Sequence, residues 1–173
     1  MSSASKKILI AYYSRKGQNY VGGKITKLPI GNTEVIAKKI QGFVGGDLFE
    51  INTVKPYPVE YTATTEVAKD ELRQNARPEL GGTVKNMEEY DVIYLGYPNW
   101  WGTFPMAVFT FLESYDFSGK TIIPFCTHEG SGLGRSEQDV KKHCPNAKVL
   151  PGIAIYGSKV TTVDNAVQSW LKM

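Results

Sequence analysis

The sequence predicts an α/β fold, a three-layer αβα sandwich with a five-stranded parallel sheet in its middle layer. Short apolar runs alternate with amphipathic segments along the whole chain, a pattern typical of a sheet with helices on both faces. The runs at 7–13 and 91–97 are almost continuously apolar, as expected for strands buried on both sides. Right-handed crossovers and a final helix favour the strand order 2-1-3-4-5.

The individual elements follow from periodicity and from chain breakers. Strands are predicted at 7–13, 47–53, 91–97, 121–126 and, interrupted by Pro151-Gly152, within 147–156. Helices are predicted at 33–44, 60–76, 104–113, 134–143 and 161–171, with a single turn at 86–90. The inner side of the helix at 60–76 is expected to carry Tyr61, Val67, Ala68 and Leu72. The first helix carries Ile36 and Ile40 on one face and stops at Gly45-Gly46, and its N-cap is expected at Asn32 or Thr33.

Residues 15–30 interrupt this alternation. They contain several glycines and Pro29, so a loop is predicted there, with room for a small hairpin. A structureless segment of this length is unusual in a compact domain and often functional. The alternative is a harmless surface insertion.

Length and composition limit the classes of protein. The 173 residues, of which 42% are hydrophobic and 21% charged, suit a single domain over 6–172 after a disordered stretch at 1–5. A net charge of +3 is too small to indicate nucleic-acid binding. Two cysteines without a CxxC and two histidines predict no metal site. Without a long apolar run or a signal-peptide pattern, a cytoplasmic protein that does not span a membrane is expected.

Two short pieces of sequence are suited to hold a phosphate. Ser14 directly follows the first predicted strand, and Gly31-Asn32-Thr33 leads into the first helix. The first turn of a helix offers backbone N–H groups without internal partners, and hydroxyl side chains add donors. Ser14, Asn32 and Thr33 are therefore predicted to form a phosphate pocket. The alternative is a plain helix start after a loop.

Unusual loops follow the first, third and fourth predicted strands. They comprise residues 14–33, the double-tryptophan segment 98–102 and the glycine-rich segment 127–132. In the order 2-1-3-4-5 all three lie at the carboxyl edge of the sheet, beside the switch point where ligands bind. Three such loops at one edge strengthen the prediction of a binding site.

The segments ILIAYYSRKGQN, GNTEVIAKKI, DVIYLGYPNWWGTFP and IPFCTHEGSGLG resemble the flavodoxin-like FMN proteins. The resemblance is greatest to the branch in which an insertion separates the first Ser from Gly-Asn-Thr. It implies non-covalently bound FMN, with phosphate at Ser14, Asn32 and Thr33. It places the isoalloxazine ring beside Pro98, Asn99, Trp100, Trp101 and Gly102, and beside a second loop with Thr127, His128, Gly130, Ser131 and Gly132.

Each assignment has a less specific alternative. Trp100 and Trp101 could be core residues or an oligomer contact. His128 and Glu129 suggest an acid/base pair, but neighbouring side chains usually point in different directions, so no catalytic residue is assigned. Gly130 and Gly132 could form an ordinary turn.

Three further interpretations concern residues around these loops. Arg15 and Lys16 could bind phosphate or remain solvated, and Tyr57 and Tyr61 could cover the pocket. The insertion and the double tryptophan leave room for a homodimer.

The function expected from the resemblance is electron transfer by an NAD(P)H-dependent oxidoreductase that reduces quinones or similar acceptors. The alternative is a flavodoxin that carries single electrons between proteins. Such carriers are typically strongly acidic, so a net charge of +3 favours the enzyme. A binding module that has lost redox function is a third alternative, and Ser14, Asn32 and Thr33 argue against it.

Overall fold

A computed structural model describes residues 5–173 of the chain. The first four residues lie outside this range, and with them most of the N-terminal stretch predicted to be disordered. No helix within the described range is both long and apolar enough to cross a membrane.

The central sheet consists of parallel strands, as predicted. Its members are β1 (Ile8–Tyr12), β4 (Asp47–Glu50), β5 (Val92–Pro98), β6 (Thr121–His128), β7 (Lys148–Val149) and β8 (Ile153–Tyr156). The order is β4-β1-β5-β6, and β7 and β8 both pair with β6. The predicted order is therefore observed, with the fifth strand divided into two pieces. The division lies at Pro151-Gly152, where proline cannot donate to the ladder.

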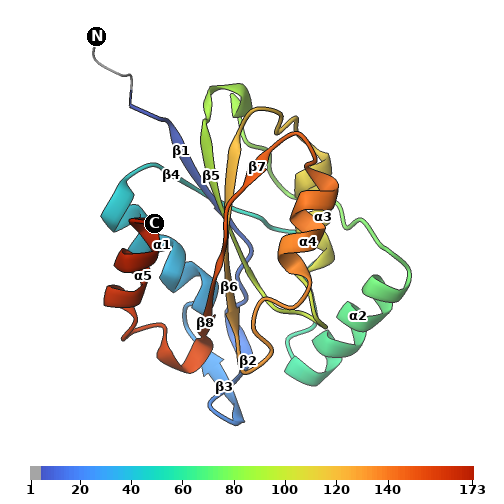
Figure 1. Ribbon diagram of the computed structural model, residues 1–173. Coiled ribbons are helices and arrows are strands. Elements are labelled where there is room, and N and C mark those ends of the chain that lie inside the picture. Colours follow the sequence, from blue (N-terminus) through green and yellow to red (C-terminus); the bar gives the residue numbers. More distant parts are fainter. Residues whose placement is uncertain (1–4) are drawn as a thin grey trace.

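Helices cover both faces of the sheet (Figure 1). One face carries α1 (Asn32–Val44) and α5 (Asp164–Leu171), and the other carries α3 (Met106–Glu113) and α4 (Ser136–His143). Short 3-10 turns lie at η1 (Met87–Glu89) and η2 (Gly157–Lys159). The remaining helix, α2 (Tyr61–Arg73), stands beyond α3 and away from the sheet.

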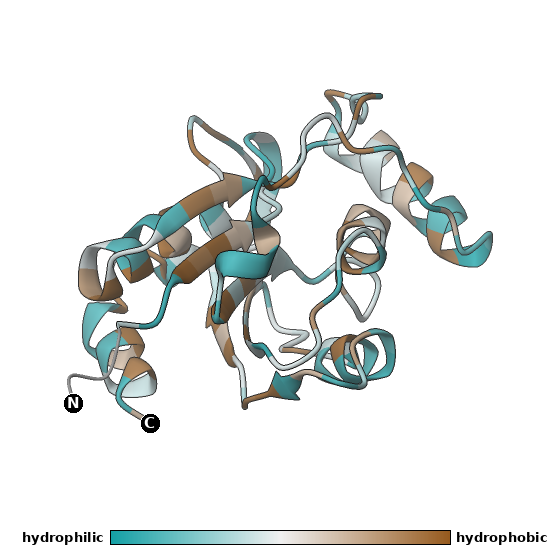
Figure 2. Cartoon of the chain, turned by 90° about the horizontal axis from the view of Figure 1, so that it is seen from above, coloured by the Kyte–Doolittle hydropathy of each residue, from teal (hydrophilic) through white to brown (hydrophobic). Residues whose placement is uncertain are grey.

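Alternation along the strands divides the core into two layers. Leu9 and Ala11 of β1 pack under α3 and α4, whereas Ile10 and Tyr12 pack under α1 and α5. Apolar residues accordingly concentrate on the strands and on the inner sides of the helices (Figure 2). Both faces of the sheet are buried, which explains the continuous hydrophobic runs in the sequence.

Helix α2 differs from its predicted packing. Of the residues predicted on its inner side, Ala68 is buried and Leu72 packs against the core, but Val67 is 38% exposed, and Thr64 is buried in addition. The reason is position, because α2 contacts α3 and the insertion and does not lie on the sheet. A helical pattern predicts an apolar side without specifying what covers it.

The insertion forms the small hairpin for which the sequence left room. Strands β2 (Gly17–Val21) and β3 (Lys24–Leu28) pair antiparallel as a separate two-stranded sheet. Gly22 and Gly23 form the turn with φ of 61° and 88°. Two-residue hairpin turns require positive φ, which glycine adopts without strain.

Candidate functional site

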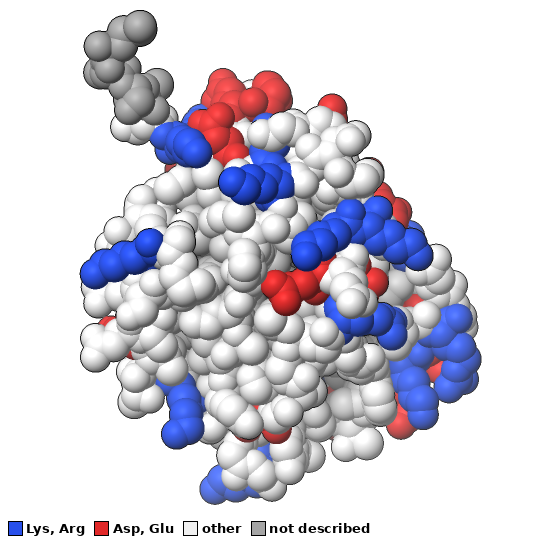
Figure 3. Space-filling view, viewed as in Figure 1, with Lys and Arg blue, Asp and Glu red and all other residues white. Residues whose placement is uncertain are grey.

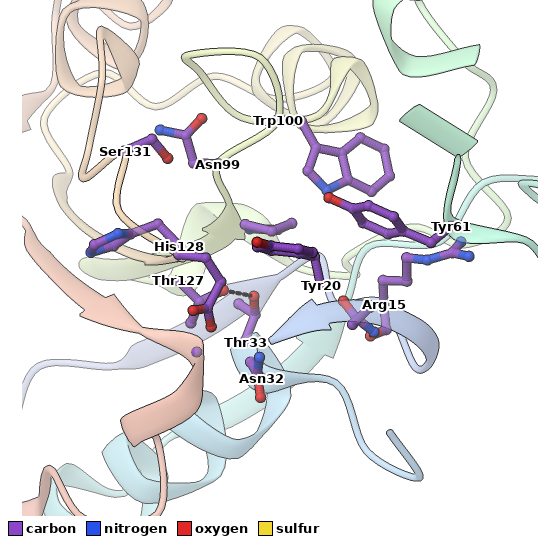
Figure 4. Close-up of a pocket in the computed structure, with 14 residues that line it drawn as sticks. Arg15, Tyr20, Asn32, Thr33, Tyr61, Asn99, Trp100, Thr127, His128 and Ser131 are labelled. Carbon is purple, nitrogen blue, oxygen red and sulfur yellow. Dashed lines mark hydrogen bonds between the residues drawn. The ribbon is translucent and has the colours of Figure 1, made fainter. Parts of the chain in front are cut away.

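A pocket of about 260 Å³ lies at the carboxyl edge of the sheet. It is bounded by the start of α1, the β2–β3 hairpin, and the loops after β5 and β6 (Figure 4). The predicted site residues that line it are Asn32, Thr33, Pro98, Asn99, Trp100, Thr127, His128 and Ser131. The chain thus brings the predicted phosphate segment and both predicted ring-side loops to one cavity, as the switch-point rule requires.

The first helix begins differently from the sequence expectation. Its N-cap is Gly31, without a side-chain cap of its own, and neither Asn32 nor Thr33 holds that position. The cap comes from Ser14, whose Oγ accepts a hydrogen bond from the Glu34 backbone N–H at 3.0 Å. A serine hydroxyl also has one donor, and that donor has no acceptor within residues 5–173.

The donor set at this helix start fits a phosphate group. Within residues 5–173, the backbone N–H groups of Asn32 and Thr33 have no hydrogen-bond acceptor. They stand at the positive end of the α1 dipole, where anions are stabilised. Together with the Ser14 hydroxyl, they supply the kind of donors that a phosphate group needs.

Two glycines shape the wall of the pocket. A Cβ added to Gly31 would lie 2.1 Å from Ser14 Oγ and 2.6 Å from the Arg15 carbonyl oxygen. A Cβ added to Gly157 would lie 2.4 Å from Asn32 Nδ2 and 2.7 Å from Glu129 Oε1. At Gly31 the obstacle includes the Arg15 backbone, so only glycine fits without a shift of the chain, whereas at Gly157 the side-chain ends of Asn32 and Glu129 would have to move.

Thr33 is buried, with 2% of its surface exposed, and its hydroxyl lies 2.8 Å from that of Thr127 (Figure 4). This bond joins the first turn of α1 to the end of β6. One of the two hydroxyls donates in the pair, so the proton of the other remains free for a further acceptor. The pair therefore joins the two walls and still offers a donor.

The two tryptophans point in different directions. Trp100 enters the pocket and packs edge-to-face against Tyr13 and Tyr57, with ring centroids 5.2 Å apart in both pairs. Trp101 has a φ of 59° and donates its indole N–H to the Thr65 carbonyl oxygen of α2. Positive φ is uncommon for a bulky residue. Trp101 belongs to an adjoining cavity and not to this one.

Asn99 holds the two ring-side loops together. Its Oδ1 accepts from the Gly102 N–H at 2.9 Å, and its Nδ2 donates to the Gly132 carbonyl oxygen at 2.8 Å. Gly102, Gly130 and Gly132 do not line the pocket, and their positive φ values of 93°, 127° and 65° shape the loops instead. Ser14 is likewise not among the lining residues, and its contact within the chain is the cap on the Glu34 N–H.

His128 and Glu129 have separate partners. His128 Nδ1 accepts from the Gly130 N–H at 2.8 Å, and the ring packs on Tyr156. Burial lowers the pKa of His128, which favours the neutral ring. The Glu129 carboxylate accepts from the N–H of Ser158 at 2.9 Å and of Gly22 at 3.3 Å. It therefore ties the hairpin tip to η2 and forms no pair with His128.

Several lining residues were not among the predicted site residues. They come mainly from the hairpin side of the pocket: Arg15, Asn19, Tyr20, Tyr61, Glu129 and Gly157. The rings of Tyr20 and Tyr61 stack with centroids 6.2 Å apart and an interplanar angle of 25°. The sequence analysis considered Tyr57 and Tyr61 as covers for the pocket, and Tyr61 lines it whereas Tyr57 does not. For Tyr20, the available signal was an aromatic residue inside a glycine-rich insertion.

Arg15 lines the pocket and is half-buried, so it does not remain fully solvated, and its contacts within the chain are to backbone carbonyls. Its Nη2 donates to the carbonyl oxygens of Pro58 and Val59, and its Nε donates to that of Gln18. The guanidinium thus fastens the segment before α2 to the hairpin. Burial lowers the pKa of Arg15.

Comparison with known proteins places the chain in a family. The family model described as flavodoxin matches residues 7–173. A Bacteroides eggerthii protein, provisionally described as a flavoprotein, shares 30% identity over 97% of both chains with a TM-score of 0.78. A similarly described Bacteroides uniformis protein shares 29% identity over 97% of this chain and 99% of the other, with a TM-score of 0.76.

A flavoprotein of Lactobacillus acidophilus, solved in complex with FMN, has the same fold at 20% identity. The match covers 96% of this chain and 99% of the other, with a TM-score of 0.70. No curated protein matches the chain. With the parallel sheet, the switch-point pocket and a family match that spans nearly the whole sequence, the chain belongs to the flavodoxin family.

Proposed function

We propose that the protein binds FMN non-covalently in this pocket and works as an NAD(P)H-dependent oxidoreductase that reduces quinones or similar small acceptors. The observation that carries the proposal is a single pocket with a phosphate-suited helix start and an aromatic wall. Membership of the flavodoxin family and the FMN complex of a structural neighbour support FMN as the cofactor. When bound, FMN supplies the electron-transfer chemistry, and the protein positions and tunes it.

The phosphate end is formed by the start of α1. Ser14, Asn32 and Thr33 would hold the phosphate through hydroxyl and backbone N–H donors. Among residues 5–173, Arg15 is the only lysine or arginine that lines the pocket, and its Nε and Nη2 are engaged with backbone carbonyls, which leaves only Nη1 for a ligand. Neutral donors and the helix dipole would therefore carry most of the recognition.

The ring end is formed by Trp100 and by the loop after β6. An aromatic side chain contributes about 1 kcal/mol beyond area burial when it packs on another ring system. The position of Trp100 is fixed by Tyr13 and Tyr57, so little ordering would be needed on binding. His128, kept neutral by burial, would place no positive charge beside the ring.

The charge distribution favours an enzyme over a protein-to-protein carrier. The net charge is +3, and basic and acidic side chains are interspersed on the face seen in Figure 3. A carrier that docks on basic partners is expected to present a continuous acidic surface. The carrier remains the second candidate, because the cofactor site would be the same.

The test is a flavin spectrum followed by anaerobic reduction. The protein is purified with added FMN, and NADH or NADPH is then added under anaerobic conditions. Bound flavin that loses its visible absorbance within seconds supports the oxidoreductase. Bound flavin that is reduced by dithionite but not by either nicotinamide supports the carrier. Protein that retains no flavin at high FMN concentration contradicts both.

A further inference from the structure

A second cavity of about 280 Å³ adjoins the proposed FMN pocket. It lies between α2, the β2–β3 hairpin and the loop after β5 that carries Trp100 and Trp101. We propose that this cavity is the acceptor subsite and that it selects planar aromatic compounds carrying one carboxylate or sulfonate group. The inference rests on the proposed function and names its substrate class.

The two cavities are parts of one cleft. Arg15, Asn19, Tyr61, Asn99 and Trp100 line both. A molecule in the second cavity would therefore lie directly beside the contents of the first, with Trp100 at their boundary. An enzyme needs such a place for a small acceptor, whereas a carrier that passes electrons between proteins does not.

Aromatic groups form the walls of the second cavity. Trp100 and Trp101 line one side, and Tyr61 of α2 lines another. Trp101 is 48% exposed yet held in place, because its indole N–H donates to Thr65 and Lys69 Nζ lies 5.3 Å from its ring centroid. Flat aromatic walls favour flat aromatic ligands, through offset stacking and edge contacts.

The charge of Arg15 is the reason for proposing a carboxylate or sulfonate on the ligand. Arg15 is the only charged residue that lines the cavity among residues 5–173, and no carboxylate faces it there. Its Nε and Nη2 bind carbonyl oxygens, and Nη1 has no acceptor within the described chain. A partly buried guanidinium without a counterion attracts a carboxylate or sulfonate. The lowered pKa of Arg15, which results mainly from burial, agrees with the absence of a nearby acid.

Most other polar groups in the cavity already have partners. The hydroxyl of Thr64 donates to Pro58 and Glu60, and that of Thr65 donates to Thr62. Asn99 uses both ends of its amide in the loop contacts. The cavity therefore offers one cationic donor among apolar rings, which suits a ligand with a single anionic group on a flat body.

The test is calorimetric binding of a matched pair of redox-inert probes to the FMN-loaded protein at low salt. The probes are 2-naphthalenesulfonate and 2-naphthol, which share the ring system and differ in charge. We expect the sulfonate to bind at least about tenfold more tightly. Arg15→Met should remove about tenfold of sulfonate affinity and leave 2-naphthol within about twofold. Ala68→Leu, which fills the cavity, should weaken both probes.

Three controls separate charge from structure. Lys141→Met removes one positive charge from the exposed side of α4 and should leave both affinities unchanged. Gln18→Ala loosens the start of α2 without removing charge and should preserve the preference for the sulfonate. Arg15→Lys keeps the charge and should retain part of the preference for the sulfonate that Arg15→Met loses.

The proposal is overturned if the two probes bind equally, if Arg15→Met retains the preference, or if Gln18→Ala abolishes it as fully as Arg15→Met does. Displacement of FMN by the sulfonate would also overturn it, because the cavity would then belong to the cofactor. Failure of the proposed function would give a different result. The protein would then retain no FMN and would still bind the sulfonate more tightly than 2-naphthol. Flavin reduced by NADH without any sulfonate preference refutes only the subsite.

Discussion

Helices α1 and α2 both begin at the cleft, and neither caps its own first turn. The N-caps Gly31 and Glu60 make no side-chain cap bond. Each helix is capped from the segment that follows β1. Ser14 Oγ accepts from the Glu34 N–H of α1, and Gln18 Oε1 accepts from the Tyr61 N–H of α2 at 2.8 Å. One short stretch of chain therefore positions two helix starts that are far apart in sequence.

The two helix starts differ in what supports them. The first turn of α1 is buried against the sheet and joined to β6 through Thr33 and Thr127. The start of α2 is held by the hairpin, through Arg15 and Gln18. The proposed phosphate end is therefore built on a buried helix start that is bonded to the central sheet, whereas the proposed acceptor end is built on elements outside that sheet. Changes at the start of α1 should affect the cofactor, and changes at the start of α2 should spare it.

The largest effect is expected from Gly31→Ala. The added Cβ would overlap Ser14 Oγ and the Arg15 carbonyl. The start of α1 would therefore have to move away from the Ser14–Arg15 segment, which would distort the proposed phosphate pocket. We expect a loss on the order of 3 kcal/mol in FMN affinity, with lower stability. Fluorescence titration with FMN and urea unfolding measure the two effects.

Gly42→Ala on the same helix is the matched control. Apart from its chain neighbours and the nearby backbone of α1 itself, no atom lies within 4 Å of a Cβ added to Gly42. Alanine in a helix interior stabilises by about 0.5–1 kcal/mol relative to glycine, and FMN affinity should not change. Equal FMN affinities for the two variants would contradict the account of the α1 start.

Thr33→Val should have the next largest effect. It removes one hydroxyl from the pocket and leaves Thr127 buried without its partner. We expect FMN binding to weaken by about 1.5–3 kcal/mol, as for a hydrogen bond to a charged group. Thr33→Ser keeps the hydroxyl and should retain most of the affinity. An unchanged titration for the valine variant would remove Thr33 from the proposed site.

A smaller and more selective effect is expected from Gln18→Ala. The Tyr61 N–H loses its acceptor, so the first turn of α2 should lose about 1 kcal/mol of local stability, as for a lost helix cap. Amide hydrogen exchange in that turn should speed up while FMN affinity stays within about twofold. Ser14→Ala, the equivalent change on α1, should lower FMN affinity as well. A similar decrease in FMN affinity in Gln18→Ala and Ser14→Ala would contradict the proposed difference between the starts of α1 and α2.

The smallest effect concerns pH and His128. Burial lowers the pKa of His128 below its ordinary 6.5, so the folded protein favours the neutral ring, whose Nδ1 accepts the Gly130 N–H. The resulting stabilisation is present above the ordinary pKa and is lost as pH falls through the lowered pKa. Protonation would remove the acceptor of the Gly130 N–H, so the ring-side loop should loosen and FMN affinity should decrease as the pH falls.

His128→Phe separates this effect from titration of the FMN phosphate, whose second pKa also lies near 6. The variant retains only the phosphate contribution, so its affinity should depend less on pH than that of the wild type. Identical pH profiles would show that protonation of His128 does not affect the ring-side loop.

Much of the architecture was predictable because it depends on local patterns. The runs at 7–13 and 91–97 correctly indicated strands buried on both faces, and the alternation of elements predicted the sheet order that is observed. The predicted phosphate segment and ring-side loops converge on one pocket, since the carboxyl ends of parallel strands share one edge.

The errors concern contacts between distant segments. Asn32 and Thr33 are good local N-caps, but Gly31 holds that position because Ser14 approaches too closely for a side chain. Adjacent Trp100 and Trp101 could not be distinguished in sequence, and they diverge because Trp101 takes a positive φ and reaches α2. Val67 has the right periodicity for burial, but α2 has no sheet beneath it.

By itself, the sequence determined the fold class, the strand order and the edge at which a ligand should bind, because hydrophobic period and strand direction are local properties. Only the tertiary structure decided that residues 15–30 form a hairpin whose Arg15 and Gln18 hold α2. It also decided that a second cavity opens beside the first. Both depend on side chains that meet across some 40 residues of chain, and no local pattern specifies such meetings.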